Sequence, residues 1–114
     1  MKTVFIVDDT DFILDILSLY VEEMGMRAIL AETGPQSLEI FQTQTPDYAL
    51  IDLTLKIGPQ GKELMDVLKI LSPTTKYIAM SGHSDHPIMR FPTTFGFAAS
   101  LIKPFNNEDL KKVL

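Results

Sequence analysis

The chain has 114 residues, of which 46% are hydrophobic and 22% are charged, and its formal net charge is −5. This length and composition are typical of a single folded domain and exclude a disordered chain. The absence of cysteine excludes disulfides and thiolate sites and is consistent with the cytoplasm. No basic stripe is present, which argues against direct nucleic-acid binding. No apolar stretch approaches the roughly 20 residues of a membrane span, and residues 1–7 do not resemble a signal peptide. We therefore expect a soluble, cytoplasmic protein.

Strand-like and helical segments alternate from the N-terminus. Thr3 to Val7 is a short, apolar, β-branched run that predicts a buried strand. A helix-period pattern follows, and Gly25 is placed to end that helix. Arg27 to Ala31 predicts a second strand. The inward-facing positions of the helix are Ile13, Ile16, Leu17, Tyr20, Val21 and Met24.

A capped helix and a buried strand come next. Thr33 is a typical N-cap residue, and Pro35 suits the first turn of the helix that it would cap. This helix is expected to end before Pro46 and to turn Leu38 and Phe41 inward. Tyr48 to Leu53 predicts a third strand, which is apolar except for one carboxylate.

The second half of the chain continues the alternation. A helix follows Gly61 and ends before Pro73, and Tyr77 to Met80 predicts a fourth strand. Leu64, Leu68 and Leu71 lie on one face of this helix. Ser100 to Ile102 predicts a short fifth strand. The last helix opens at Asn106 and carries Leu110, Val113 and Leu114.

The segment from His83 to Ala99 is harder to assign. Pro87 can start a helix, but Pro92 lacks an amide donor and clashes with the preceding turn. We expect only a short or irregular helix there.

This alternation predicts an α/β domain with a parallel sheet and helices on both of its faces. Ligands of such sheets bind beyond the carboxyl ends of the strands, at the switch point in strand order. Asp8 and Asp9 follow the first strand, Asp52 lies near the end of the third, Ser81 follows the fourth and Lys103 follows the fifth. We expect all of them at one edge of the sheet.

Clustered carboxylates raise each other's pKa unless a cation lies among them. Mg²⁺ prefers hard oxygen ligands and typically takes one or two carboxylates together with phosphate oxygens. A carboxylate such as Asp52 can attack a phosphoryl group to form an acyl phosphate. Positioning and charge neutralisation by Mg²⁺, Lys103 and the Ser81 hydroxyl would support that transfer.

Structural interpretations also exist for each residue alone. Asp8 and Asp9 can serve as helix-capping residues that favour the helix dipole. Ser81 can belong to a turn, and Lys103 to a strand ending. Asp52 is harder to explain structurally, because a carboxylate in an apolar strand costs several kcal/mol without a partner. The combination at one edge carries the inference.

At these residues the chain resembles the receiver domains of two-component response regulators, over essentially its whole length. The matching segments are Val7 to Asp9, Ile51 to Leu55, Met80 to Asp85 and Leu101 to Phe105. Each is weak alone, but the ordered set is specific. The resemblance implies a flavodoxin-like, doubly wound sheet with strand order 2-1-3-4-5, and one receiver domain over residues 1–114.

The resemblance also implies roles for the residues. Asp52 would take a phosphoryl group from a sensor histidine kinase, a phosphotransfer protein or a small phosphodonor. Asp9 would bind Mg²⁺ directly and Asp8 mainly through water, while Asp52 and the Thr54 carbonyl complete the metal site. Ser81 would be the hydroxyl that moves to the phosphate, and Lys103 would be the lysine of the family pattern that contacts it. The bond from Lys103 to Pro104 is usually cis in this family.

Three positions depart from the family pattern. Ser100 stands where an aromatic residue usually rotates inward on activation. The loop after Asp52 carries Lys56 in place of a common proline and is one residue longer before Gly61. Pro92 disturbs the fourth helix, which is part of the usual output face. The residues for phosphoryl transfer are therefore all present, whereas the residues that couple phosphorylation to output are altered.

Two groups of side chains, one in the altered region and one beside the site entrance, have open assignments. Phe91, Phe95 and Phe97 are expected to pack in or beside the core, with an exposed apolar patch as the alternative. His83 and His86 are expected to be surface loop residues, although His83 is placed to modulate the access of water to the site.

The leading hypothesis is a phosphorylation-controlled switch that is not an enzyme in its own right and acts on an attached or separate effector. The alternative is a pseudo-receiver that binds partners without phosphorylation. A phosphatase is disfavoured, because its usual second acid would stand at Thr54. The oligomeric state, the cognate kinase and the output are not specified by the sequence.

Overall fold

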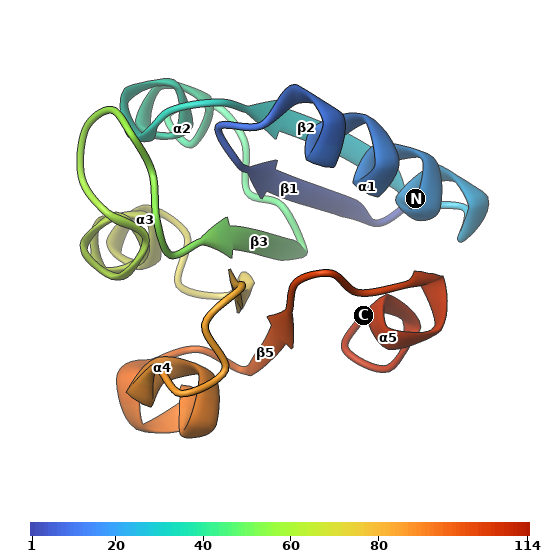
Figure 1. Ribbon diagram of the computed structural model, residues 1–114. Helices are drawn as coiled ribbons and strands as arrows, with labels where there is room; N and C mark the ends of the chain where they lie inside the picture. The colour runs from blue at the N-terminus through green and yellow to red at the C-terminus, as the bar shows by residue number, and fades with distance from the viewer.

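A computed structural model describes all 114 residues and contains one parallel sheet in the order β2-β1-β3-β4-β5 (Figure 1). The strands are β1 (Thr3–Val7), β2 (Arg27–Ala31), β3 (Tyr48–Asp52), β4 (Lys76–Ser81) and β5 (Ala99–Ile102). The helices are α1 (Asp11–Glu23), α2 (Gly34–Ile40), α3 (Gly61–Leu71), α4 (Pro87–Arg90) and α5 (Asn107–Lys111), with a 3-10 turn, η1 (Pro92–Phe95), after α4. The predicted fold class and strand order are confirmed.

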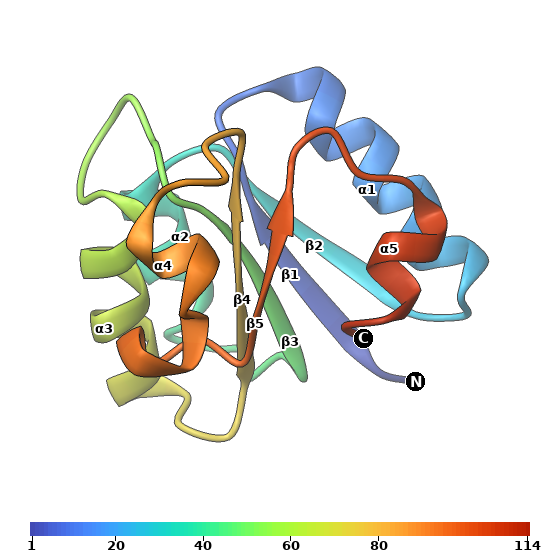
Figure 2. The same cartoon turned by 60° about the horizontal axis from the view of Figure 1, so that its bottom comes forward.

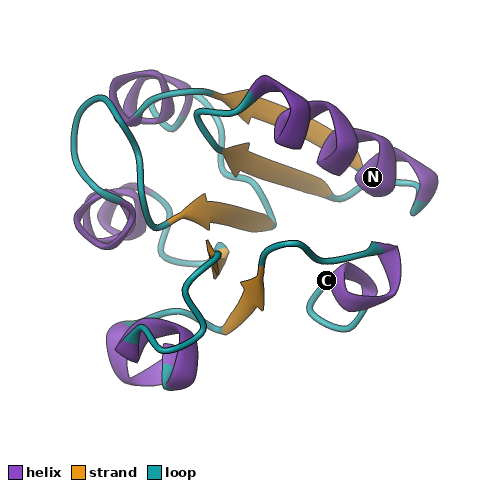
Figure 3. Cartoon of the chain, viewed as in Figure 1, coloured by secondary structure: helices purple, strands orange, loops and turns teal.

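The helices cover both faces of the sheet. Figure 2 shows α1 and α5 on one face and α2, α3 and α4 on the other, and Figure 3 separates the helical layers from the strands by colour. Successive residues of a strand point to opposite faces. In β1, Phe5 packs with the α2–α3–α4 side while Val4 and Ile6 pack with the α1–α5 side. Burial on both faces explains why the inner strands are continuous apolar runs.

Local signals in the sequence set several helix boundaries as predicted, but α5 ends at Lys111, before Val113 and Leu114, which were expected within it. The Thr33 side chain accepts from the Gln36 amide at 3.2 Å and caps α2. Asn106 and Asp109 form a reciprocal capping box at the start of α5. Gly25 follows α1 with φ of 78°, a left-handed conformation that glycine adopts at low cost.

The predicted apolar face of α3 is only partly buried. Leu64 and Leu68 of α3 are buried, but Leu71 is 38% exposed. Leu71 is the final residue of the helix, next to the turn at Ser72, and the core cluster on this face ends at Leu68. Met65, which the pattern did not select, is buried instead.

The segment after β4 is irregular, as Pro92 predicted. α4 has only four residues, and Phe91 leaves the helical conformation with φ of −134° and ψ of 62°, because a residue before proline is disfavoured in the α region. Phe97 is buried and Phe95 packs against the core, as expected. The expectation that Phe91 packs in or beside the core is wrong. Phe91 is 56% exposed, and the Arg90 guanidinium lies over its ring.

None of the helices is long and apolar enough to cross a lipid bilayer.

Candidate functional site

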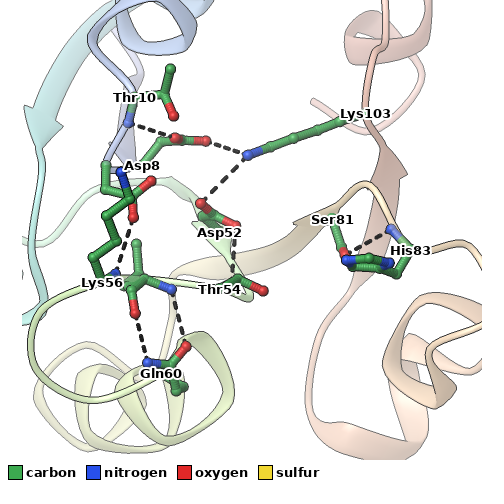
Figure 4. A network of polar contacts seen from close by, with 11 residues as sticks. Asp8, Thr10, Asp52, Thr54, Lys56, Gln60, Ser81, His83 and Lys103 are labelled. Atoms are coloured by element: carbon green, nitrogen blue, oxygen red, sulfur yellow. Dashed lines mark hydrogen bonds and ion pairs between the residues drawn. The ribbon is translucent and has the colours of Figure 1, made fainter.

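Strand register brings the predicted site residues to one edge of the sheet. Val7 pairs with Ile51, so the acids after β1 lie beside the end of β3. Asp52 pairs with Met80, and the next residue of β4 is Ser81. Ser81 pairs with Ile102, so Lys103 follows at the same level. Figure 4 shows these side chains converging between the loops.

Asp8 is a completely buried carboxylate whose oxygens both have partners. Its Oδ1 accepts from the Thr10 amide at 2.9 Å, and its Oδ2 forms an ion pair with the Lys103 ammonium. Thr10 is the N-cap residue of α1, and no side chain caps that helix. The Asp8–Asp9 pair therefore does not supply the N-cap residue of α1: Asp8 bonds the amide of that residue, and both carboxylates belong to the acidic cluster.

Asp52 lies at the centre of the cluster and is only 5% exposed. Its Oδ1 accepts from the Thr54 amide at 3.1 Å, and its Oδ2 lies 3.5 Å from Lys103 Nζ. Burial raises the pKa of Asp52, the Thr54 amide and Lys103 lower it, and the neighbouring Asp8 and Asp9 raise it again. The net shift of the Asp52 pKa is upward, so the charged form of this carboxylate is less stable in the site than in water.

Carboxylate oxygens of Asp8, Asp9 and Asp52 all lie within 4.8 Å of one another. A single ammonium, that of Lys103, faces this group, so negative charge is in excess. Hard oxygen donors with excess negative charge suit Mg²⁺. Thr54 lies in the loop after β3, and its carbonyl accepts no hydrogen bond within the chain, which leaves that oxygen free for a ligand.

Ser81 contributes the hydroxyl of the site and is 4% exposed. Its Oγ accepts from the His83 amide at 3.0 Å, while its carbonyl accepts from the Lys103 amide at 2.8 Å. The Lys103–Pro104 bond is cis, as the resemblance implied. His83 and His86 are exposed, as expected, and His86 caps α4 by accepting from the Ile88 amide through Nδ1.

The sequence did not indicate three further contacts at the site. The Thr10 amide holds Asp8, the Lys56 amide donates to Asp9 Oδ2 at 3.0 Å, and the Gln60 side chain binds the backbone of Leu55 (Figure 4). A backbone amide shortly after an acidic residue is a common partner for it, so the contact from Thr10 had a recognisable signal. The other two depend on the path of the loop and had none.

Comparisons with known proteins agree with this geometry. The family model described as the response regulator receiver domain matches residues 4–114. A receiver domain protein from Methanospirillum hungatei has 29% identity and a TM-score of 0.88, with coverage of 98% of this chain and 89% of that one.

Curated relatives are longer than this chain. The photosynthetic apparatus regulatory protein RegA of Rhodobacter capsulatus is 27% identical over 99% of this chain, which covers 61% of RegA. The autoinducer 1 sensor kinase/phosphatase LuxN of Vibrio campbellii is 30% identical over 72% of this chain, which covers 10% of LuxN. Because the family model spans nearly all of the sequence, the chain belongs to the receiver domains of two-component response regulators.

Proposed function

We propose that this receiver domain accepts a phosphoryl group on Asp52 in a Mg²⁺-dependent reaction, acts in the cytoplasm, and changes conformation as a result. The observation that carries the proposal is the buried Asp52 carboxylate with Lys103 3.5 Å away and two further carboxylates within 4.8 Å. A cluster of this kind needs a cation, and a phosphoryl group needs a nucleophile, a cation and a hydrogen-bond donor around it.

The chain's own residues have distinct tasks in this reaction. An oxygen of Asp52 forms a bond to phosphorus as the bond between phosphorus and the donor's nitrogen or oxygen breaks, and the electron pair leaves with the donor. Lys103 is placed to neutralise charge on the transferred group. Asp8 keeps the Lys103 ammonium at this position through their ion pair. Bound Mg²⁺, held by Asp8, Asp9, Asp52 and the Thr54 carbonyl, would supply additional charge neutralisation.

Ser81 links the phosphoryl group to the rest of the molecule in this proposal. Its hydroxyl lies at the end of β4, the strand next to Asp52, where it accepts from the His83 amide. New phosphate oxygens are strong acceptors and would attract the Ser81 hydroxyl as a donor. The loop from Ser81 to α4 would then move with it.

A sensor histidine kinase or a phosphotransfer protein is the proposed donor, and an attached or separate effector is the proposed recipient of the signal. The pseudo-receiver remains the second candidate, because Ser100 and Pro92 alter the output side. A phosphatase has no support, since Thr54 stands where a second acid is needed.

The test is the intact mass of the wild type and of Asp52→Asn after incubation with acetyl phosphate, with and without Mg²⁺. We expect the wild type to gain one phosphoryl group only with Mg²⁺, and Asp52→Asn to gain none. No gain by a folded wild type would favour the pseudo-receiver. A gain by Asp52→Asn would show that another residue is the acceptor.

A further inference from the structure

The loop between β3 and α3, residues 53–60, is fastened to the domain at its base. The Gly61 amide donates to the Leu53 carbonyl at 3.3 Å, so the two ends of the loop meet. A Cβ at position 61 would lie 2.4 Å from the Asp52 carbonyl oxygen. Only glycine permits this approach, and the loop must therefore leave and re-enter beside the phosphoacceptor strand.

The Gln60 side chain also holds the loop, through the backbone of Leu55. Its Oε1 accepts from the Leu55 amide at 3.0 Å, and its Nε2 donates to the Leu55 carbonyl at 2.6 Å. Gln60 occupies the N-cap position of α3, where Ser, Thr, Asp or Asn would normally bond to the helix. It makes no such cap. Both polar atoms of the side chain are committed to the loop instead.

The tip of the loop rests on the start of α2. A Cβ on Gly34 would lie 2.7 Å from Pro59 Cδ, and one on Gly58 would lie 2.7 Å from Pro35 Cδ. Gly58 also has φ of 84°, which favours glycine. Each proline therefore packs against the glycine of the other segment, and this reciprocal contact restricts the loop from outside.

Leu55 is the residue that Gln60 fixes, and its two neighbours both contact carboxylates of the site. The Thr54 amide donates to Asp52 at 3.1 Å, and the Lys56 amide donates to Asp9 at 3.0 Å. The Leu55 side chain itself is buried in the core. A shift of Leu55 would therefore displace two hydrogen bonds to the proposed metal ligands together with the free Thr54 carbonyl.

We propose that Gln60 is a positioning residue for the cation site, which it serves by holding the backbone of Leu55 so that residues 54 and 56 face the carboxylates. The inference rests on the proposed function, in which these carboxylates bind Mg²⁺. Outer-shell partners of metal ligands typically change metal affinity by about 10- to 100-fold when they are removed.

The test compares Gln60→Met with the wild type, because methionine keeps the length of the side chain and removes both hydrogen bonds. Mg²⁺ affinity is measured by calorimetry, and amide hydrogen exchange is measured at Leu55 and Lys56. We expect Mg²⁺ binding to weaken roughly 10-fold or more, with faster exchange at these two amides and unchanged exchange in β1 and β4. The matched control is Gln42→Met, at an exposed glutamine whose amide makes only a 3.4 Å contact with Leu38.

The outcomes distinguish the role of Gln60 from the existence of the Mg²⁺ site. If Gln60→Met binds Mg²⁺ as the wild type does, Gln60 has no positioning role, even where exchange is faster throughout the domain. If the wild type itself binds no Mg²⁺, the proposed cation site is wrong, and the role of Gln60 is wrong with it. Weaker binding in Gln60→Met but not in Gln42→Met supports the proposal.

Discussion

The sheet edge that carries Asp8, Asp9, Asp52 and Lys103, called the cation edge after the proposed function, is built differently from the segment from His83 to Ile102. At the cation edge, buried side chains converge from separate elements, and backbone amides hold each carboxylate in place: Thr10 for Asp8, Lys56 for Asp9 and Thr54 for Asp52. The loop that borders this edge is fastened at its base, inside and at its tip. Such an arrangement is preorganised for a ligand.

In the second segment the helix is broken, although Ile88, Met89 and Phe97 are buried in the core. In a continuous helix the Met89 carbonyl would accept from residue 93, but Pro92 ends α4 early. The Met89 carbonyl accepts instead from Ser100 Oγ at 2.8 Å. Ser100 is the residue that stands where the family has an aromatic side chain. Two of the three departures from the family pattern are therefore linked: Pro92 ends α4, and Ser100 bonds the Met89 carbonyl that this leaves without a helical partner.

The two regions therefore differ in how strongly their polar contacts depend on one another. The buried charges at the cation edge are interdependent, so a change in one disturbs the others. The α4–β5 segment offers a neutral, partly buried contact that can be replaced by another at small cost. Substitutions in the two regions should therefore differ in the size of their effects.

Lys103→Met is expected to have the largest effect. Its removal leaves the completely buried Asp8 without its counter-charge, which costs about 3 kcal/mol of stability. Mg²⁺ should stabilise this variant more than the wild type, because the cation becomes the only counter-charge. Urea unfolding with and without Mg²⁺ measures both effects. Lys62→Met, which breaks only an exposed pair with Asp66, should change stability by less than about 0.5 kcal/mol. Equal losses in the two variants would contradict the buried charge network.

Gly61→Ala tests the tight base of the β3–α3 loop. The new Cβ would overlap the Asp52 carbonyl, and we expect a loss of roughly 1–3 kcal/mol. Gly82→Ala is the matched control in the loop after β4, where no atom lies within 4 Å of the added Cβ. Thermal unfolding of both variants checks the difference. A Gly61→Ala variant as stable as Gly82→Ala would show that the loop base is not rigid.

Asp52→Asn gives a pH-dependent effect. Burial raises the pKa of Asp52 in the folded state above its value in the unfolded state. The carboxyl therefore contributes stability at a pH below the unfolded-state pKa. That contribution is lost as the pH rises through the folded-state pKa. Without metal, Asp52→Asn should therefore melt a few degrees higher than the wild type at neutral pH, and the gain should shrink toward about pH 4. Melting curves across this range provide the measurement. A wild type that is the more stable form at neutral pH would mean that pairing with Lys103 outweighs burial.

Ser100→Ala is expected to have the smallest effect. It removes one neutral hydrogen bond to Met89 and should cost about 1 kcal/mol or less. Hydrogen exchange should rise in α4 and β5 but stay unchanged at Leu55 and Lys56, while phosphoryl uptake stays at the wild-type level. Ser100→Thr retains the hydroxyl and serves as the control. Faster exchange at the cation edge in Ser100→Ala would show that the two regions are coupled in the resting state.

Local patterns in the sequence determined the fold class and the members of the chemical cluster, while the strand order was implied by the family resemblance. Apolar runs such as Thr3 to Val7 can be stable only when buried on both faces, which requires a covered parallel sheet. Residues at the ends of parallel strands and directly after them meet at one edge, which brings Asp8, Asp52 and Lys103 together. Caps at Thr33 and Asn106 are similarly local, since a side chain meets an amide two or three residues away.

Only the tertiary structure decided which partner each polar group takes. Asp8 and Asp9 are as well suited to cap a helix as to line a site. The ion pair of Asp8 with Lys103 and the bond from the Lys56 amide to Asp9 decide between the two roles. Gln60 has no local signature, because its contacts depend on how a seven-residue excursion folds back on itself between Leu53 and Gly61. Leu71 and Phe91 fit apolar patterns yet lie exposed, because burial depends on which neighbour covers a position and not on the residue alone. Pairings between distant segments are set by the packing of the whole chain, and periodicity does not encode them.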